Sequence, residues 1–309
     1  MSANSAVEPG APAPSGGEAQ QQTGGGLTIQ ILRVFAENRL AVFGAVLIVL
    51  IVLFCFLGPV FYHTNQTDTQ KALLTAPANA PPGGAYPLGT DSNGFDMLGR
   101  IMYGGQISLE VGFAAAGIAT LLGVLVGAVS GFFGGVVDAL LMRFVDVLLS
   151  VPLLYLLIVL AVIFHPSVEI LILVIGFTAW LVPARLVRGE TLSLRVREFV
   201  QAVRVMGGGG GRIVLRHIIP NTIGTIIVNA TFQIADAILL LAALGFIGLG
   251  VPSPQTDWGS MISLGVNYAD AGDWWEIYPT GVAIVLVVVA FNFVGDALRD
   301  AFEVRLQRR

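Results

Sequence analysis

The chain has 309 residues and a formal net charge of −4, and 55% of its residues are hydrophobic while only 12% are charged. Soluble globular domains carry roughly 25% charged residues, so this composition excludes most soluble enzymes. The small net charge says little about partners, because in such a chain the positions of the basic residues carry the information.

The first segment, residues 1–26, is rich in Ala, Gly, Pro, Ser and Gln and has no apolar cluster. This composition predicts a disordered tail. The segment is unlike a secretory signal peptide, because the first apolar run is long and follows Arg33 and Arg39; we therefore expect that run to stay as a membrane anchor. The single cysteine, Cys55, lies inside the run, so no intrachain disulfide can form.

Six apolar runs are long enough to cross ~30 Å of hydrocarbon. They cover residues 40–57, 108–133, 147–164, 168–186, 222–244 and 278–294. The sequence therefore predicts an all-α, polytopic membrane protein with six transmembrane helices.

The second run has a small residue at every fourth position. These residues are Ala115, Ala119, Gly123, Gly127, Gly131 and Gly135. Such a stripe favours the close approach of another helix, from this chain or from a second subunit. The alternative is that glycine is simply frequent in membrane helices.

Basic residues are distributed very unevenly between the loops. Fourteen of the sixteen Lys and Arg residues fall before span one, between spans two and three, between spans four and five, or after span six. The stretch 250–277 has none. The positive-inside rule therefore puts both termini in the cytoplasm.

Four regions follow from this pattern. They are a cytoplasmic tail (1–26), the first span with an extracytoplasmic segment (27–107), a core of five spans (108–299) that includes a cytoplasmic loop (187–217), and a basic C-terminal tail (300–309).

The loop between spans four and five contains a short amphipathic helix, predicted over residues 197–206. Its apolar positions are Phe199, Val200, Val203 and Met206, with Glu198, Gln201 and Arg204 elsewhere. Two interpretations are open: the helix docks in a groove of a partner protein, or it lies on anionic lipid, which the nearby arginines would also favour.

Span five carries Asn229, Gln233 and Asp236 on one helical face. A charged Asp near the bilayer centre costs about 2.5–3.5 kcal/mol on insertion scales, so its presence there indicates a functional role. We interpret this face as lining a hydrated translocation path. The alternative is that Asp236 is paired or protonated between helices and has only a structural role.

The sequence offers no convincing metal or catalytic site. Residues 91–96 begin like a calcium loop but lack its glycine, so a turn formed by Asx side chains is the better interpretation. The three histidines are widely separated, and the sequence contains no HExxH, Gly-x-Ser-x-Gly or Walker pattern.

The loop between spans four and five resembles the EAA loop of ABC-importer permeases. That motif runs Glu-Ala-Ala, three residues, Gly, nine residues and Ile-x-Leu-Pro. Here Gln201-Ala202-Val203 stands for Glu-Ala-Ala, Gly207 is the glycine, and His217-Ile218-Ile219-Pro220 closes the motif. Three departures stand out: Gln201 replaces the glutamate, Val203 replaces the second alanine, and Gly207 to Gly211 form a run of five glycines.

Other segments are similar to C-type permease subunits of dipeptide/oligopeptide importers, in order from about residue 40 to 305. They are Pro87-Leu88-Gly89-Thr90-Asp91 with Gly94, Asp96 and Arg100; Asp138, Met142-Arg143, Asp146 and Pro152; residues 244–251; residues 257–261; and residues 290–300.

The resemblance implies an ABC importer type I permease fold and an ATPase-coupling role for one set of residues. This set is Glu198, Phe199, Gln201, Ala202, Arg204, Gly207, His217 and Pro220. It also implies that the chain lies in the bacterial cytoplasmic membrane and has four partners: a homologous second permease, two ATPase subunits that bind ATP and Mg, and an extracytoplasmic solute-binding protein. We expect this chain to have no catalytic residue, metal or cofactor, to contact lipid, and to bind no nucleic acid.

Two competing classes are an intramembrane enzyme and a stand-alone channel or carrier. An enzyme needs a nucleophile with a base, or a metal set, at membrane depth, and Ser108 and Ser150 have no histidine in a span beside them. A channel has no need of an arginine-rich amphipathic loop.

We expect Trp258, Trp274 and Trp275 at the outer membrane interface. The substrate could be a dipeptide, a longer peptide, a nickel complex or an oligosaccharide.

Overall fold

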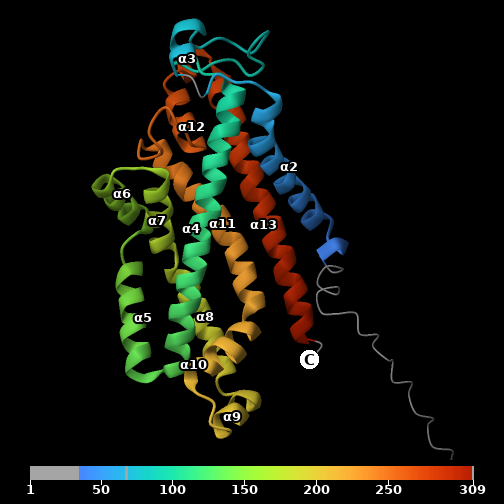
Figure 1. The fold of residues 1–309 in the computed structure, drawn as a ribbon, viewed down its shortest axis with the longest axis vertical. Helices are drawn as coiled ribbons and strands as arrows, with labels where there is room; N and C mark the ends of the chain where they lie inside the picture. The colour runs from blue at the N-terminus through green and yellow to red at the C-terminus, as the bar shows by residue number, and fades with distance from the viewer. Residues whose placement is uncertain (1–34, 67–68, 308–309) are drawn as a thin grey trace, which may run out of the picture.

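The computed structural model describes residues 35–66 and 69–307, which form an elongated bundle of helices (Figure 1). The predicted tail at 1–26 lies outside these residues. The main helices are α2 (Arg39–Phe61), α3 (Thr69–Thr75), α4 (Met97–Phe133), α5 (Gly135–Leu149), α6 (Leu153–Phe164), α7 (Val168–Ala179), α8 (Leu181–Leu194), α9 (Glu198–Val205), α10 (Gly210–Ile213), α11 (Ile223–Phe246), α12 (Trp258–Val266) and α13 (Tyr278–Gln307). Within the described ranges the only strand-like features are two isolated β-bridges, so the all-α prediction is confirmed.

Five segments are long and apolar enough to cross a membrane, or six if the bent pair α5 and α6 counts as one span. The α5–α6 pair corrects the predicted span 147–164. Its two helices meet at an angle of 84°. Pro152, which has no N–H to donate, precedes α6, and Arg143 lies within α5 instead of in a loop.

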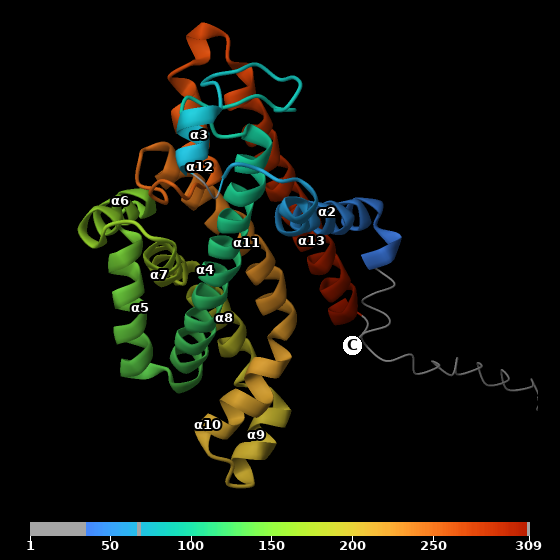
Figure 2. The ribbon, with the colours of Figure 1, turned by 45° about the horizontal axis from the view of Figure 1, so that its top comes forward.

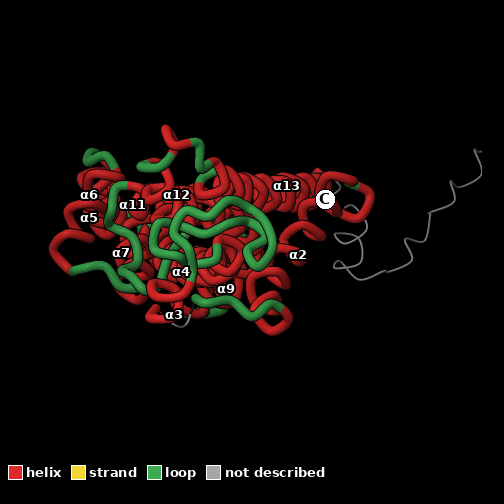
Figure 3. The backbone as a smooth tube through the Cα atoms, turned by 90° about the horizontal axis from the view of Figure 1, so that it is seen from above, coloured by secondary structure: helices red, strands yellow, loops and turns green. Residues whose placement is uncertain are grey.

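Helix α4 is the centre of the bundle and packs against α2, α5, α7, α8 and α11. Figure 3, which looks down the long axis, shows α5 and α6 on one side of α4 and α2 with α13 on the other. The helix starts at Met97, earlier than the predicted residue 108, because Asp96 caps it. The Asp96 carboxylate accepts hydrogen bonds from the backbone N–H groups of Leu98 and Gly99, each at 3.2 Å.

The stripe of small residues on α4 forms an interface within this chain. A Cβ added to Gly123 would collide with the Cβ of Pro183 on α8, one on Gly127 would collide with the backbone carbonyl of Ala184 on α8, and one on Gly131 would come within 2.7 Å of the Cβ of Thr191. The stripe therefore lets α4 and α8 approach closely, as small residues do in membrane helix pairs. Gly135 lies outside this interface because α4 ends at Phe133.

The two ends of the bundle differ. One end, here called the α12 end, carries α3 and α12, and the opposite end, here called the α9 end, carries α9 and α10; Figures 1 and 2 agree on this arrangement. The segments between α7 and α11 at the α9 end contain seven arginines. The loops 250–257 and 267–277 around α12 contain no Lys or Arg.

Candidate functional site

Helix α9 is a short helix with well-defined ends. It starts at Glu198, whose negative charge is favourable beside the helix N-terminus, and it has Arg204 in its last turn. At its other end the N–H of Gly207 donates to the carbonyl of Arg204 at 3.0 Å, and the N–H of Gly208 donates to the carbonyl of Val203 at 2.9 Å. This pair of bonds is a Schellman motif, and Gly207 supplies the left-handed residue that it needs, with φ of 82°.

The apolar residues of α9 divide between two faces. Val200 is fully buried in an apolar cluster that includes Val214 and Ile218 of the following turn (Val214–Ile218), and Val203 packs against this cluster. Phe199, Val205 and Met206 are 40%, 88% and 77% exposed. The sequence analysis assigned Phe199, Val200, Val203 and Met206 to one apolar face; the structure instead uses two of them to anchor the helix and leaves the other two, with Val205, uncovered.

The polar members of the predicted coupling set are exposed on the same loop, apart from half-buried His217. Gln201, the departure from glutamate, donates from its Nε2 to the carbonyl of Arg195 at 3.2 Å. The Arg204 guanidinium lies 5.7 Å from the ring centre of Phe132 on α4. The carbonyl of His217 accepts a hydrogen bond from Asn221 at 2.6 Å, while Ala202 and Pro220 are exposed.

The five-glycine run contains both crowded and open positions. A Cβ on Gly208 would lie 2.5 Å from the Cγ1 of Val203, and one on Gly210 would lie 2.9 Å from the ring of Phe132. Gly209 and Gly211 have open space around them. The run therefore joins α9 to α10 through specific close contacts.

A second candidate site is a cavity of about 420 Å³ on the polar face of α11. The cavity lies where two other helices are interrupted, at residues 148–153 between α5 and α6 and at residues 178–182 between α7 and α8. All three predicted path residues, Asn229, Gln233 and Asp236, line it. Interrupted helices at membrane depth are tolerated where they are buried in protein or line a hydrated cavity.

Gln233 connects α11 to the break between α7 and α8. It is 8% exposed, and its Nε2 donates to the carbonyl of Ala179, the last residue of α7, at 2.8 Å. Asp236, near the middle of α11, is exposed on the cavity side. The structure thus gives the three residues different roles. Gln233 forms a hydrogen bond with the backbone at the end of α7, whereas the side chains of Asn229 and Asp236 remain available to bind a molecule in the cavity.

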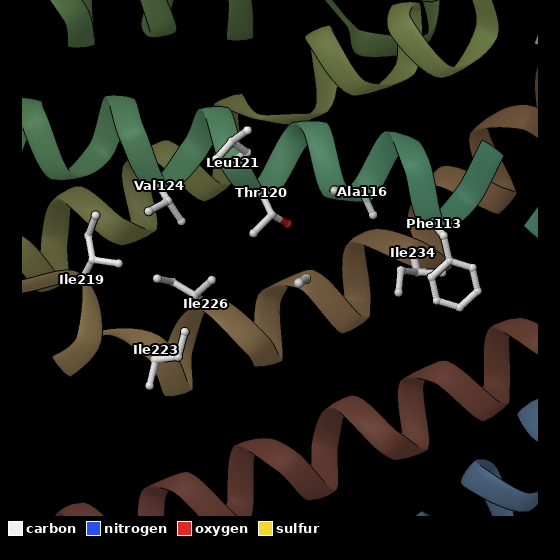
Figure 4. A pocket seen from close by; sticks show the side chains of 11 residues that line it. Phe113, Ala116, Thr120, Leu121, Val124, Ile219, Ile223, Ile226 and Ile234 are labelled. Atoms are coloured by element: carbon white, nitrogen blue, oxygen red, sulfur yellow. The ribbon is translucent and has the colours of Figure 1, made fainter. Parts of the chain in front are cut away.

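The opposite face of α11 forms a separate groove with α4. Figure 4 shows this pocket of about 410 Å³, walled by aliphatic and aromatic side chains, with the Thr120 hydroxyl among them. Charged residues are missing from its walls within the described part of the chain. The polar cavity and this apolar groove therefore divide the two sides of α11.

A buried polar cluster lies at the α12 end. Some of its residues were named from the sequence, but only as parts of motifs that resemble those of the permease family. Arg100, 3% exposed, places its Nε 3.3 Å from the carboxylate of Asp91 and donates to the carbonyl of Pro254 at 3.3 Å. The other oxygen of Asp91 accepts from the N–H groups of Asn93 and Phe95, both at 2.9 Å, which confirms the predicted Asx turn. The buried carboxylate of Glu276 lines the same small cavity as this pair.

Burial raises the pKa of Asp91 above its ordinary value, while the charge of Arg100 and the two backbone hydrogen bonds act in the opposite direction. The cluster joins the segment before α4 to the loops around α12. Among the described residues, no group of three His, Cys, Asp or Glu side chains is arranged to hold a metal ion.

Two families match the chain. The family described as "Binding-protein-dependent transport system inner membrane component" matches residues 94–308, and the "N-terminal TM domain of oligopeptide transport permease C" matches residues 26–82. The first match covers α4 to α13, including both candidate sites.

Curated relatives match over nearly the whole chain. The chain is 38% identical over 287 residues to an oligopeptide transport system permease protein of Haemophilus influenzae, covering 93% of this chain and 91% of the relative. Identity is also 38% to the proteins of the same name from Escherichia coli, over 88% of this chain and 89% of the relative, and from Bacillus subtilis, over 89% and 88%. The chain therefore belongs to the family of binding-protein-dependent transport system inner membrane components.

Proposed function

We propose that this chain is a permease subunit of an ATP-driven importer of oligopeptides. The observation that carries the proposal is α9, a short helix at the α9 end that leaves Phe199, Val205 and Met206 uncovered. A groove in a partner protein is the natural cover for such a helix. The names of the curated relatives support peptides as the cargo.

The proposed complex contains a homologous second permease, two ATPase subunits and an extracytoplasmic solute-binding protein. ATP and Mg belong to the ATPase subunits, and this chain transmits their movement without catalysing hydrolysis. The residues proposed to contact an ATPase are those of α9 and the segment that follows it, including Gly207, His217 and Pro220. The cavity at Asn229, Gln233 and Asp236 is proposed as part of the translocation path, and the apolar outer faces contact lipid.

We further propose that the α9 end faces the cytoplasm of a bacterial cell, with both termini on that side. The basic residues support this orientation, because arginines gather between α7 and α11 while the loops around α12 have none. The α12 end would then receive cargo from the binding protein.

The function can be tested by purification and transport. Affinity-tagged chain, purified from its native membrane, is expected to carry ATPase subunits with it. Proteoliposomes that contain the complex should take up labelled tri-alanine only when ATP is inside and the binding protein is on the other side. Purification of the chain without any ATPase, or uptake that needs no ATP, would contradict the proposal.

The orientation can be tested by cysteine labelling. In a Cys55→Ala parent, a cysteine at the exposed position Asp270 should react with a membrane-impermeant thiol reagent in intact cells. A cysteine at Arg204, also exposed, should react only after the membrane is permeabilised. Labelling of Arg204→Cys in intact cells would reverse the proposed topology.

A further inference from the structure

The cavity on the polar face of α11 has a specific chemical bias. Two of its hydrogen-bonding side chains already donate to backbone: the Nε2 of Gln233 donates to the carbonyl of Ala179 at 2.8 Å, and the hydroxyl of Thr178 donates to the carbonyls of Val174 and Ile175 at 2.7 and 3.0 Å. In contrast, the Oδ1 of Asn229 is buried and has no hydrogen-bond partner within the described residues. The cavity wall therefore holds a buried acceptor that lacks a donor.

Asp236 adds a charge to this set. Within residues 35–66 and 69–307, its carboxylate makes no ion pair or hydrogen bond, and the residues lining the cavity include no Lys, Arg or His. An uncompensated carboxylate at this depth is costly, and a buried carbonyl oxygen without a donor adds to that cost. Both costs fall when a group that carries a positive charge and N–H donors enters the cavity.

Resting on the proposed transport function, we propose that the cavity contains a binding subsite for the ammonium group of the cargo. Asp236 supplies the countercharge and Asn229 accepts a second N–H hydrogen bond. An ammonium group has donors but no acceptor, which suits a site with an unpaired carboxylate and a buried carbonyl oxygen that lacks a donor. The remaining wall is mainly aliphatic, with Leu149, Leu181 and Leu240 among its members, and it accommodates the carbon chain attached to the ammonium group.

A peptide offers an ammonium group from two sources, its N-terminus and a lysine side chain. Uptake by Asp236→Asn complexes separates them. If the N-terminus is bound, uptake of both tri-alanine and alanyl-lysyl-alanine at limiting concentration should fall about tenfold, as expected when one partner of a desolvated charge pair is removed. If the side chain is bound, only uptake of the lysine peptide should fall. Asp300→Asn makes the same chemical change at an exposed position on α13 and should leave uptake unchanged.

A second measurement does not depend on peptide transport. Leu239 lines the cavity and is 44% exposed, so a cysteine there, in the Cys55→Ala parent, reports on the local charge. A cationic trimethylammonium-ethyl methanethiosulfonate should modify it faster than the anionic sulfonatoethyl reagent. Asp236→Asn should lower this ratio of rates at least severalfold, and Asn229→Asp, which adds a carboxylate of nearly the same shape, should raise it.

The uptake and modification measurements distinguish a failure of the proposed transport function from a failure of the proposed ammonium subsite. If the unmutated complex takes up neither peptide, the proposed function is wrong, while the ratio of modification rates still tests the subsite. If Asp236→Asn leaves both uptake and the ratio as they are in the parent, the ammonium subsite is wrong. Should Asp236→Asn fail to accumulate, an unchanged ratio in Asn229→Asp would overturn the proposal in the same way.

Discussion

Replacing Arg100 by Met is expected to lower the free energy of unfolding by about 3–5 kcal/mol, the cost of removing one partner from a buried ion pair. Arg100 is 3% exposed and pairs with Asp91, and Glu276 lies on the same small cavity with 1% exposure. Methionine fills much of the volume but leaves the buried carboxylate of Asp91 without its cation. The measurement is the midpoint of thermal unfolding of the detergent-solubilised protein.

The matched control is Arg143→Met, because Arg143 is exposed on α5. It should shift the midpoint little. The double variant Asp91→Asn/Arg100→Met should recover part of the loss, since it removes the stranded charge of Asp91. Equal effects of Arg100→Met and Arg143→Met would show that the cluster does not stabilise the α12 end.

The loss of stability in Arg100→Met should depend on pH, and the sign of that dependence follows from the pKa of Asp91. Burial raises the pKa of Asp91, and Arg100 is the charge that opposes this shift. Without Arg100, the folded-state pKa lies further above the unfolded value of about 3.9. The folded state then prefers the protonated acid, so the penalty is absent below the unfolded pKa and grows as pH rises toward the folded pKa. The destabilisation should be smaller at pH 5 than at pH 8.

The helices that the sequence predicted well are those whose signal is entirely local. The runs predicted at 40–57 and 222–244 correspond to α2 and α11, because a long apolar segment in lipid has to satisfy its backbone as a helix. The structure of the run at 147–164 was predicted less well. Hydropathy is continuous across the bend before α6, so only Pro152 marked it, and proline within a membrane helix does not by itself give an angle.

Contacts between distant segments could not be read from the sequence. Trp258 and Trp275, expected at the outer membrane interface, are instead buried, and their ring N–H groups donate to the carbonyls of Ile101 and Thr90. The inward and outward faces of α9 were confused for a related reason. An apolar position that anchors the helix and one that awaits a partner look alike in a helical period.

The three residues on the polar face of α11 were predicted together because a fixed spacing on one helix decides which side chains share a face. That spacing could not reveal that Gln233 would bond to Ala179, which requires the break between α7 and α8. The roles of Asn229 and Asp236 become distinct only once the neighbouring helices are known.

Replacing Gly207 by Val is expected to separate ATP hydrolysis from peptide uptake. Gly207 has a φ of 82°, a backbone conformation that a β-branched residue adopts only under strain. Space is not the obstacle, because no other residue of the described chain lies within 4 Å of an added Cβ. The variant should therefore fold, yet hold α9 at a different angle to the bundle.

The angle matters because of how α9 is attached. Val200 and Val203 fix the helix on the apolar cluster that includes Val214 and Ile218, and the Schellman turn at Gly207 and Gly208 fixes its exit toward α10. A rigid helix attached at both points transmits a push from an ATPase to α11, whereas a helix with a loosened exit rotates under the same push. Peptide uptake should fall at least about tenfold, about 1.4 kcal/mol of coupling, while basal ATPase activity persists.

The glycine run itself supplies the controls. Gly209→Ala should keep uptake and ligand-stimulated ATPase activity, because Gly209 has φ of −68° and open space around it. Gly208→Ala should behave like Gly207→Val, since its Cβ would lie 2.8 Å from the carbonyl oxygen of Val203, the acceptor of the Schellman bond. Both activities are measured on the same proteoliposomes with the binding protein present. If Gly209→Ala loses uptake while Gly207→Val and Gly208→Ala keep it, the turn after α9 does not carry the coupling, and the flexibility of the run does.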